Sequence, residues 1–363
     1  MKIVTVLGTR PEIIRLSRVI PALDGVCRHV VVFTGQNYDP GLSTLFFEQL
    51  RVRAPDHRLD TKAETTWAQI GNILSQTDKI LAEEKPDRFL VLGDTNSALT
   101  AMCAKRRGIP VYHMEAGNRC FDDRVPEEVN RRVIDHSSDV LLPYTNRSRD
   151  HLLREAFAPN RIYVTGNPIK EVMDFYAVEI DASDVMRRLG VEAGGFFLVT
   201  LHRAENVDVP ERLRSFMDTF GAMSREYGIP VLLSLHPRTR DRVRAWDVAK
   251  GDGVRFIDPP GFFDFVNLEK HAKALLSDSG TVQEEGCIMG RPTVTLRDVT
   301  ERPETLECGS NILSGCGRDE ILRCLGIVLE RGGGWTVPAE YLAERVSAAV
   351  VRILLGYRPA SIR

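Results

Sequence analysis

The stretch KIVTVLGTRPEII, residues 2–14, contains the pattern that decides the fold. Ile3–Leu7 is a nearly continuous apolar run, which is typical of a parallel strand that is covered on both faces. Gly8 and Thr9 then provide a turn, and Pro11 suits the first turn of a helix. A strand, a tight turn and a helix in this order predict the start of a doubly wound α/β domain.

The same strand-and-helix pattern runs through the chain in two series. The first series of predicted strands is Ile3–Leu7, Val30–Phe33, Phe89–Leu92, Val111–His113, Val140–Leu142 and Ile162–Val164. The second series is Phe196–Leu201, Val231–Leu235, Arg255–Ile257, Ala274–Leu276 and Thr293–Leu296. We therefore expect an α/β protein of two Rossmann-like doubly wound domains, with the active site in a cleft between the carboxyl ends of their strands.

Domain boundaries follow from breaks in this pattern. Pro168 disfavours a helix at Asn167, and a polar, strand-poor stretch comes next. We expect an N-terminal domain at residues 1–168 and a C-terminal domain at residues 169–345. Apolar residues near the end recur at helical spacing, so residues 346–363 are expected to form a helix that packs across the domains.

Composition excludes several classes of protein. The chain has 363 residues, with 48 Lys and Arg against 50 Asp and Glu and a net charge of -2. This balance argues against a nucleic-acid partner. The seven cysteines contain no Cys-x-x-Cys pair, which argues against a disulfide framework or a zinc finger. Neither a signal peptide nor a membrane span is evident, so we expect a soluble cytoplasmic protein without a membrane partner.

The first candidate anion site is the turn that begins at Gly8. Backbone N–H groups at a helix start favour a phosphate, and Arg10 can add two donors, with Arg15 about one turn further on. The alternative is an ordinary strand-to-helix connection with surface arginines. The turn lacks both the G-x-G-x-x-G fingerprint and a Walker lysine, so it supports neither a dinucleotide site nor an ATP loop.

The second candidate anion site is SDSGTVQEE, which starts at Ser277 and follows a predicted strand. Ser279, Gly280 and Thr281 present small side chains at a helix start, which suits a diphosphate. Glu285 can accept hydrogen bonds from ribose hydroxyls. An ordinary helix cap is the alternative, but Arg302, after the next strand, favours the nucleotide site.

Ionisable side chains also follow several predicted strands. Asp94, Glu115, Glu127 and His202 have the chemical types that proton transfer and the stabilisation of positive charge require. Each one alone fits a helix cap or a surface charge equally well. His113 is interpreted as structural. No clustered His and Cys spacing predicts a metal site.

Taken together, these motifs have a recognisable order and spacing. They are GTRPEIIR from Gly8, GDT from Gly93, HMEAG from His113, PEEVNRR from Pro126, TGNP from Thr165, HRAEN from His202, SDSGTVQEE from Ser277 and RDVTERPE from Arg297. Over nearly the whole chain they resemble the non-hydrolysing UDP-N-acetylglucosamine 2-epimerase family. The resemblance implies the GT-B type of fold.

The resemblance also implies a reaction, the interconversion of UDP-GlcNAc and UDP-ManNAc for surface polysaccharides. UDP leaves in an anti elimination that gives 2-acetamidoglucal, and it re-adds after C2 is protonated on the other face. No cofactor is implied, and a homodimer is expected.

Residue by residue, the family's acidic catalytic positions match Asp94, Glu115 and Glu127, and its active-site histidine matches His202. The resemblance does not say which carboxylate is base and which is acid. UDP-sugar-binding positions match Arg10, Arg15, Phe265, Ser279, Gly280, Thr281, Glu285 and Arg302.

Arg15, the stretch Asn118–Phe121 and Asn167-Pro168 look more like the members of the family that epimerise modified UDP-sugars at C2. Arg15 replaces a lysine, Asn118–Phe121 differs, and Gly35-Gln36-Asn37-Tyr38 replaces a Gly-Gln-His segment that helps form a second, allosteric UDP-sugar site in bacterial members. We therefore do not expect that regulation. The alternatives are a C2 epimerase of a modified UDP-HexNAc (2,3-diacetamido-uronic acid or 6-deoxy-talose/fucose type), a GT-B glycosyltransferase, a hydrolysing 2-epimerase and a UDP-sugar sensor.

Overall fold

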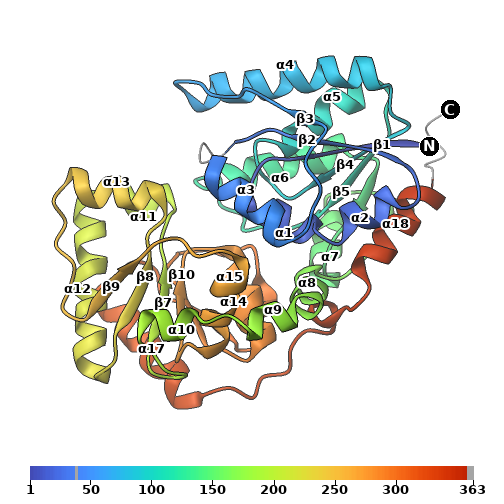
Figure 1. Cartoon of the computed structure of the whole chain (residues 1–363). Coiled ribbons are helices and arrows are strands. Elements are labelled where there is room, and N and C mark those ends of the chain that lie inside the picture. Colours follow the sequence, from blue (N-terminus) through green and yellow to red (C-terminus); the bar gives the residue numbers. More distant parts are fainter. Residues whose placement is uncertain (37–39, 358–363) are drawn as a thin grey trace. The chain divides into compact units, whose positions relative to one another are not determined.

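The structure, a computed structural model, describes residues 1–36 and 40–357. The chain forms two compact units, which are described separately below (Figure 1). Unit 1 comprises Met1–Val172 together with the segment from Ala339 onward, and unit 2 comprises Met173–Pro338. The C-terminal helix α18 (Val346–Gly356) packs against α2 (Val19–Asp24) of unit 1. The expected boundaries at residues 168 and 345, and the packing of the last helix across the domains, stay predictions.

Unit 1 is built on a six-stranded parallel sheet in the order β3-β2-β1-β4-β5-β6. Its strands are β1 (Lys2–Leu7), β2 (Arg28–Phe33), β3 (His57–Arg58), β4 (Arg88–Leu92), β5 (Val111–Met114) and β6 (Val140–Leu142). Its other helices are α1 (Arg10–Leu16), α3 (Pro40–Gln49), α4 (Thr66–Glu84), α5 (Ala101–Arg106), α6 (Pro126–Ser137) and α7 (Asn146–Arg154), and the short 3₁₀ turns are Ala98–Thr100, Pro159–Arg161 and Ala339–Leu342. Helix α8 (Ile169–Phe175) begins in unit 1 and ends in unit 2. The strand order reverses between β1 and β4, and this switch point is where ligands bind in such sheets.

The core of unit 1 explains why its strands have few polar residues. Alternate side chains such as Val4, Val6 and Phe89 pack on one face against apolar residues from the helices, including Leu81 of α4. Because the sheet is covered by helices on both sides, both sets of strand side chains are buried (Figure 1).

Unit 2 repeats this topology, with the strand order β12-β11-β10-β7-β8-β9. Its strands are β7 (Phe197–Thr200), β8 (Val231–Ser234), β9 (Val254–Ile257), β10 (Leu275–Ser277), β11 (Thr293–Thr295) and β12 (Asn311–Leu313). Its helices are α9 (Ala177–Asp181), α10 (Val185–Leu189), α11 (Ala204–Val207), α12 (Pro210–Tyr227), α13 (Pro237–Ala245), α14 (Phe262–His271), α15 (Gly280–Met289), α16 (Pro303–Glu307) and α17 (Arg318–Arg331). The switch point of this sheet lies between β7 and β10.

Ten of the predicted strands are present with small shifts in their ends, and the expected α/β class is confirmed. The prediction of a strand at Ile162–Val164 is wrong. Ile162 forms only an isolated bridge to Leu141, beside the edge strand β6. Two short edge strands, β3 and β12, were not predicted, because two or three residues give no readable periodicity.

Candidate active site

Three of the predicted site residues in unit 1 follow neighbouring strands. Arg10 begins α1 just after β1, Asp94 comes two residues after β4, and Glu115 directly follows β5. Since β1, β4 and β5 are adjacent in the sheet, their carboxyl ends meet at one edge. The topology therefore gathers these side chains at the switch point of unit 1.

The turn after β1 is organised by a residue that the sequence analysis did not single out, Glu12. Its carboxylate accepts the backbone N–H of Gly8 at 3.0 Å and of Thr9 at 2.8 Å, and the hydroxyl of Thr95 at 3.1 Å. Burial raises the pKa of Glu12 to about 7, against the lowering effect of these hydrogen bonds. The T-x-x-E spacing of Thr9 and Glu12, which is typical of a capping box, is the feature of the sequence that could have identified Glu12.

The two arginines of the first motif have different surroundings. Arg10 is half-buried, and its Cζ lies 5.8 Å from the ring centroid of Phe46. Arg15 is 3% exposed, and its Nη1 lies 3.7 Å from Oε2 of Glu115. The structure thus brings Arg15, predicted as a UDP-sugar-binding residue, next to a predicted catalytic carboxylate.

Glu115 has an unusual backbone conformation. Its φ is 68°, in the left-handed region that residues with a side chain rarely adopt, at a cost of about 1–3 kcal/mol. The side chain is buried, and its Oε1 accepts a hydrogen bond from Asn118 Nδ2 at 3.3 Å. Backbone strain at a buried carboxylate next to a strand end is typical of functional sites.

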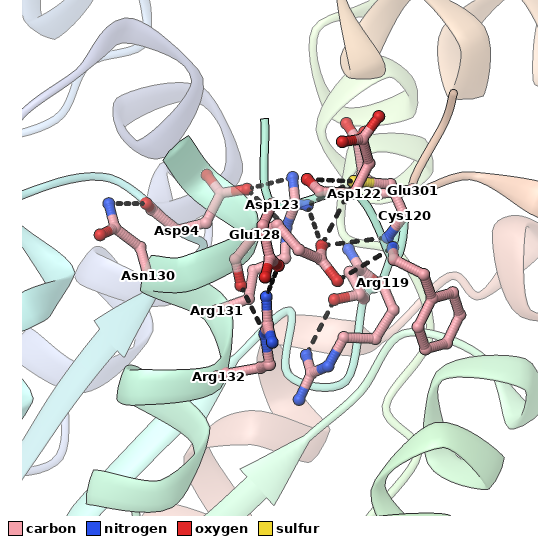
Figure 2. Close-up of polar contacts among 12 residues, drawn as sticks. Asp94, Arg119, Cys120, Asp122, Asp123, Glu128, Asn130, Arg131, Arg132 and Glu301 are labelled. Carbon is pink, nitrogen blue, oxygen red and sulfur yellow. Dashed lines mark hydrogen bonds and ion pairs between the residues drawn. The ribbon is translucent and has the colours of Figure 1, made fainter. Parts of the chain in front are cut away.

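Asp94 is held by an arginine that the sequence analysis did not identify as functional. Figure 2 shows Arg131 of α6 between Asp94 and Glu128. Its Nη2 lies 2.7 Å from Asp94 Oδ2, and its Nη1 lies 2.7 Å from Glu128 Oε2. Glu128 also accepts the backbone N–H groups of Cys120 and Phe121, each at 3.0 Å. Glu128 therefore anchors the loop before α6.

The electrostatics of Glu128 fit this structural role. Burial alone would raise its pKa, but hydrogen bonds from Cys120 N–H and Arg131 outweigh burial and hold the pKa below its usual value. Glu127, the predicted catalytic residue, lies one position earlier in α6 and is only half-buried. Side chains of adjacent helix residues point about 100° apart, so the carboxylates of Glu127 and Glu128 face different surroundings.

His113 is structural, as its isolated position in the sequence predicted. Its Nδ1 lies 2.8 Å from Asp135 Oδ1, and its Nε2 lies 2.8 Å from the backbone oxygen of Gly93. The ring is 1% exposed. His113 thus ties the end of β5 to the turn that carries Asp94.

In unit 2, a second group of predicted residues lies at the switch point between β7 and β10. Nδ1 of His202, just beyond β7, lies 2.9 Å from Oδ1 of Asp278, which directly follows β10. Asp278 is fully buried and accepts the backbone N–H groups of His202 and Arg203 at 3.0 and 2.9 Å. Burial alone would raise the pKa of Asp278, but His202 and these N–H groups hold it well below its usual range.

The predicted phosphate loop forms the start of the ten-residue helix α15. Ser279 is its N-cap, and the Ser279 and Thr281 hydroxyls lie 3.0 Å apart. A Cβ on Gly280 would come within 2.5 Å of Glu301 Oε1, so a larger residue there would have to displace the Glu301 carboxylate. The start of α15 offers backbone N–H groups for an anion.

Arg302, predicted to bind the nucleotide, forms an ion pair with Glu284. It is 5% exposed and caps the start of α16, and its Nε lies 2.5 Å from Glu284 Oε1. Glu284 precedes Glu285, which is also buried in α15.

Phe265, predicted to bind the UDP-sugar, is half-buried in α14. It packs against a buried apolar cluster that includes Leu268 and Val282.

A metal-binding cluster and a membrane-spanning helix are both absent from the described part of the molecule. Among residues 1–36 and 40–357, no group of three or more His, Cys, Asp and Glu side chains is arranged to hold a metal ion. No described helix combines the length and apolar character that crossing a membrane requires. Asn37 and Tyr38, in the segment that replaces the family's Gly-Gln-His, lie outside the described residues.

Comparisons with known proteins agree with the motif resemblance. The family model for UDP-N-acetylglucosamine 2-epimerase matches residues 23–355. A UDP-N-acetylglucosamine 2-epimerase of Methanocaldococcus jannaschii is 38% identical, with 98% of this chain and 99% of that protein aligned. A UDP-2,3-diacetamido-2,3-dideoxy-D-glucuronate 2-epimerase of Pseudomonas aeruginosa is 37% identical, with 95% of this chain and 100% of that protein aligned.

Solved structures give the same result. The crystal structure of the Methanocaldococcus jannaschii enzyme in complex with UDP-GlcNAc and UDP has a TM-score of 0.93 at 38% identity, over 98% of this chain and 99% of that one. Phytolacca americana UGT2, 13% identical over 97% and 94% of the two chains, has a TM-score of 0.58 and shares the GT-B-like fold alone. The chain therefore belongs to the UDP-N-acetylglucosamine 2-epimerase family, a family of isomerases.

Proposed function

We propose that this chain interconverts UDP-GlcNAc and UDP-ManNAc by anti elimination of UDP and its re-addition through 2-acetamidoglucal. The observation that carries the proposal is the gathering of Asp94 and Glu115 at the ends of the adjacent strands β4 and β5. Arg131 and Arg15 lie beside these two carboxylates. A site that only binds a UDP-sugar does not need acidic groups on neighbouring strands.

The residue types fit the difficulty of the reaction. The C2 proton has no adjacent carbonyl to acidify it, so C1 must develop oxocarbenium character as UDP leaves. Carboxylates near C1 and C2 stabilise that charge and accept or return the proton. Because C2 is deprotonated on one face and reprotonated on the other, at least two groups are needed, and we assign these roles to Asp94, Glu115 and Glu127.

Unit 2 supplies groups suited to the departing nucleotide. The start of α15 offers N–H groups, and His202 presents its ring with 38% of the side chain exposed. With Nδ1 facing Asp278, Nε2 remains on the opposite side of the ring for a phosphate oxygen. Together with Arg302, these donors would stabilise the diphosphate as it gains charge. Phe265 and Glu285 are assigned to uracil and ribose.

Positional isotope exchange tests the elimination step. UDP-GlcNAc labelled with ¹⁸O at the bridging anomeric oxygen is incubated with the enzyme and recovered. If the C1–O bond breaks, the label moves into non-bridging positions of the β-phosphate at a rate comparable with epimerisation. Epimerisation without such scrambling would overturn the elimination mechanism while leaving the family assignment intact.

A modified UDP-HexNAc is the second candidate substrate. The relative that acts on a UDP-2,3-diacetamido uronic acid is 37% identical, nearly the same as the UDP-GlcNAc 2-epimerase at 38%. A panel of UDP-sugars varied at C3, C4 and C6, compared by kcat/KM for C2 epimerisation, tests this candidate. Preference for UDP-GlcNAc by tenfold or more would reject it.

Assembly and location complete the proposal. We propose a cytoplasmic homodimer without a cofactor. Sedimentation equilibrium at micromolar protein tests the assembly, with a single species of about twice the 40.7 kDa chain mass expected. A monomer that is fully active would reject the dimer.

A further inference from the structure

A buried glutamate of unit 2 has no part in the reaction as proposed. Glu269 lies in α14, one turn after Phe265, and is 0% exposed. Within the part of the chain that the structure describes, no N–H or hydroxyl group donates to either of its carboxyl oxygens. A glutamate is almost never fully buried without a partner, so its surroundings need an explanation.

The partner of Glu269 is a second carboxyl group, Glu285 of α15. The two helices lie side by side in unit 2 (Figure 1). Burial, followed by the charge of Glu285 and a side-chain hydrogen bond to it, raises the pKa of Glu269 well above its usual value. Two ionised carboxylates this close would repel in a low dielectric, so the pair shares a proton, and the more buried Glu269 carries it.

A protonated glutamate becomes a hydrogen-bond donor. The Glu269 O–H can occupy one acceptor site of the Glu285 carboxylate, which has about four such sites in all. This bond fixes the Glu285 side chain and leaves the carboxylate anionic. Further acceptor sites can then receive hydroxyl donors, as a ribose diol presents them.

We propose that Glu269 is a positioning residue that donates a hydrogen bond to Glu285 and thereby sets the enzyme's preference for a ribonucleotide. This inference rests on the proposed function, in which Glu285 receives the ribose hydroxyls. A purely structural glutamate here would be a poor choice. Leu268 and Ala272 of the same helix and Val282 of α15 belong to a buried apolar cluster, and an apolar side chain at position 269 would avoid burying a carboxyl group.

The test compares Glu269→Met and Glu269→Gln with the unaltered enzyme. Methionine keeps the volume but removes the donor, whereas the glutamine amide still donates to Glu285. The dissociation constants of UDP, 2′-deoxy-UDP and 3′-deoxy-UDP are measured by calorimetry, and KM and kcat for UDP-GlcNAc are measured in parallel. Thermal unfolding reports whether each variant is folded. Glu285→Gln serves as the reference for loss of the ribose contact.

We expect the unaltered enzyme to bind UDP at least about tenfold more tightly than it binds one or both deoxy analogues. Glu269→Met should raise the dissociation constant of UDP about tenfold and leave that of the deoxy analogue nearly unchanged. For UDP-GlcNAc, KM should rise and kcat should change less than threefold. Glu269→Gln should restore most of the discrimination. The inference is overturned if Glu269→Met keeps the preference for UDP, or if it weakens UDP and the deoxy analogue equally. Failure of the unaltered enzyme to bind UDP would instead reject the proposed function as well.

Discussion

His202 and Asp278 form a 2.9 Å contact between the ends of two strands that are adjacent in the sheet but 76 residues apart in the chain. Their strands, β7 and β10, flank the switch point of unit 2. The buried aspartate orients the imidazole and, through backbone N–H groups, the residues that follow β7. In the proposed mechanism, the position of the phosphate-binding histidine therefore depends on a carboxylate that touches no substrate.

Replacing Asp278 by asparagine should cost about 2–3 kcal/mol of unfolding free energy at pH 7, because an amide cannot satisfy this set of donors as a carboxylate does. The native pKa of Asp278 is lowered, so its stabilisation is present above pH 3.8, the pKa usual for an aspartate, and is lost as the pH falls. The deficit of the variant should therefore shrink at pH 3. Urea denaturation at both pH values measures it. Asp258→Asn, at an exposed aspartate, is the control and should change stability by less than about 0.5 kcal/mol. A deficit independent of pH would contradict the account.

Two adjacent glutamates of α6 should separate catalysis from structure. Glu127→Gln should lower kcat by about 100-fold or more and leave the unfolding free energy nearly unchanged, because Glu127 is half-buried and is assigned to proton transfer. Glu128→Gln should cost about 1–3 kcal/mol of stability, since the buried carboxylate holds Arg131 and two backbone N–H groups. Steady-state kinetics and urea denaturation of both variants measure these effects. Similar kinetic and stability effects in the two variants would rule out this division of roles.

Glu12 should make the protein less stable as the pH rises toward neutrality. Its native pKa is about 7, raised from an ordinary 4.5, so its contribution is fully present below pH 4.5 and is lost as the pH rises through 7. A shift of this size corresponds to about 3 kcal/mol. Glu12→Gln mimics the protonated form and should be as stable as the unaltered protein at pH 4.5, but more stable by about that amount at pH 8.5. Denaturation curves that differ equally at both pH values would show that Glu12 does not titrate in this range.

Much of the fold was predictable from the sequence because the strands of a parallel sheet are apolar on both faces. Ile3–Leu7 and Phe89–Leu92 stand out from the polar turns around them, and they became β1 and β4 with small shifts. Ile162–Val164 has the same composition but lies beyond β6, where it makes only one bridge. Composition cannot distinguish a paired strand from an extended segment at the edge of a sheet.

For the candidate site, the positions of residues at strand ends were predictable from the sequence, but their contacts were not. The strand-end positions of Glu115 and His202 could be predicted from the sequence, because apolar runs mark the strands that precede them. The contacts of Arg131, Glu128 and Asp278 could not be predicted, since they depend on residues far along the chain or on burial. A sequence pattern shows which side chains can carry charge, but it does not show which charge is buried and paired.

Glu115→Gln should separate substrate binding from chemistry. Because the amide cannot accept the C2 proton, kcat should fall by about 100-fold or more, while the dissociation constant of UDP should change less than threefold. Glu83→Gln, on the exposed surface of α4, is the matched control and should retain both properties. Stopped assays of epimerisation and calorimetry with UDP provide the two measurements. Near-normal turnover would remove Glu115 from the catalytic set.

Exchange of the C2 hydrogen of UDP-GlcNAc with solvent shows whether the enzyme epimerises the sugar by removing and returning the C2 proton. The enzyme is incubated with UDP-GlcNAc in D₂O, and the proton NMR spectrum is followed until equilibrium. If the C2 proton is removed and replaced during epimerisation, deuterium enters C2 while UDP-ManNAc signals appear, with little free UDP. Appearance of UDP-ManNAc with the original hydrogen retained at C2, or no exchange with any UDP-HexNAc, would contradict this mechanism.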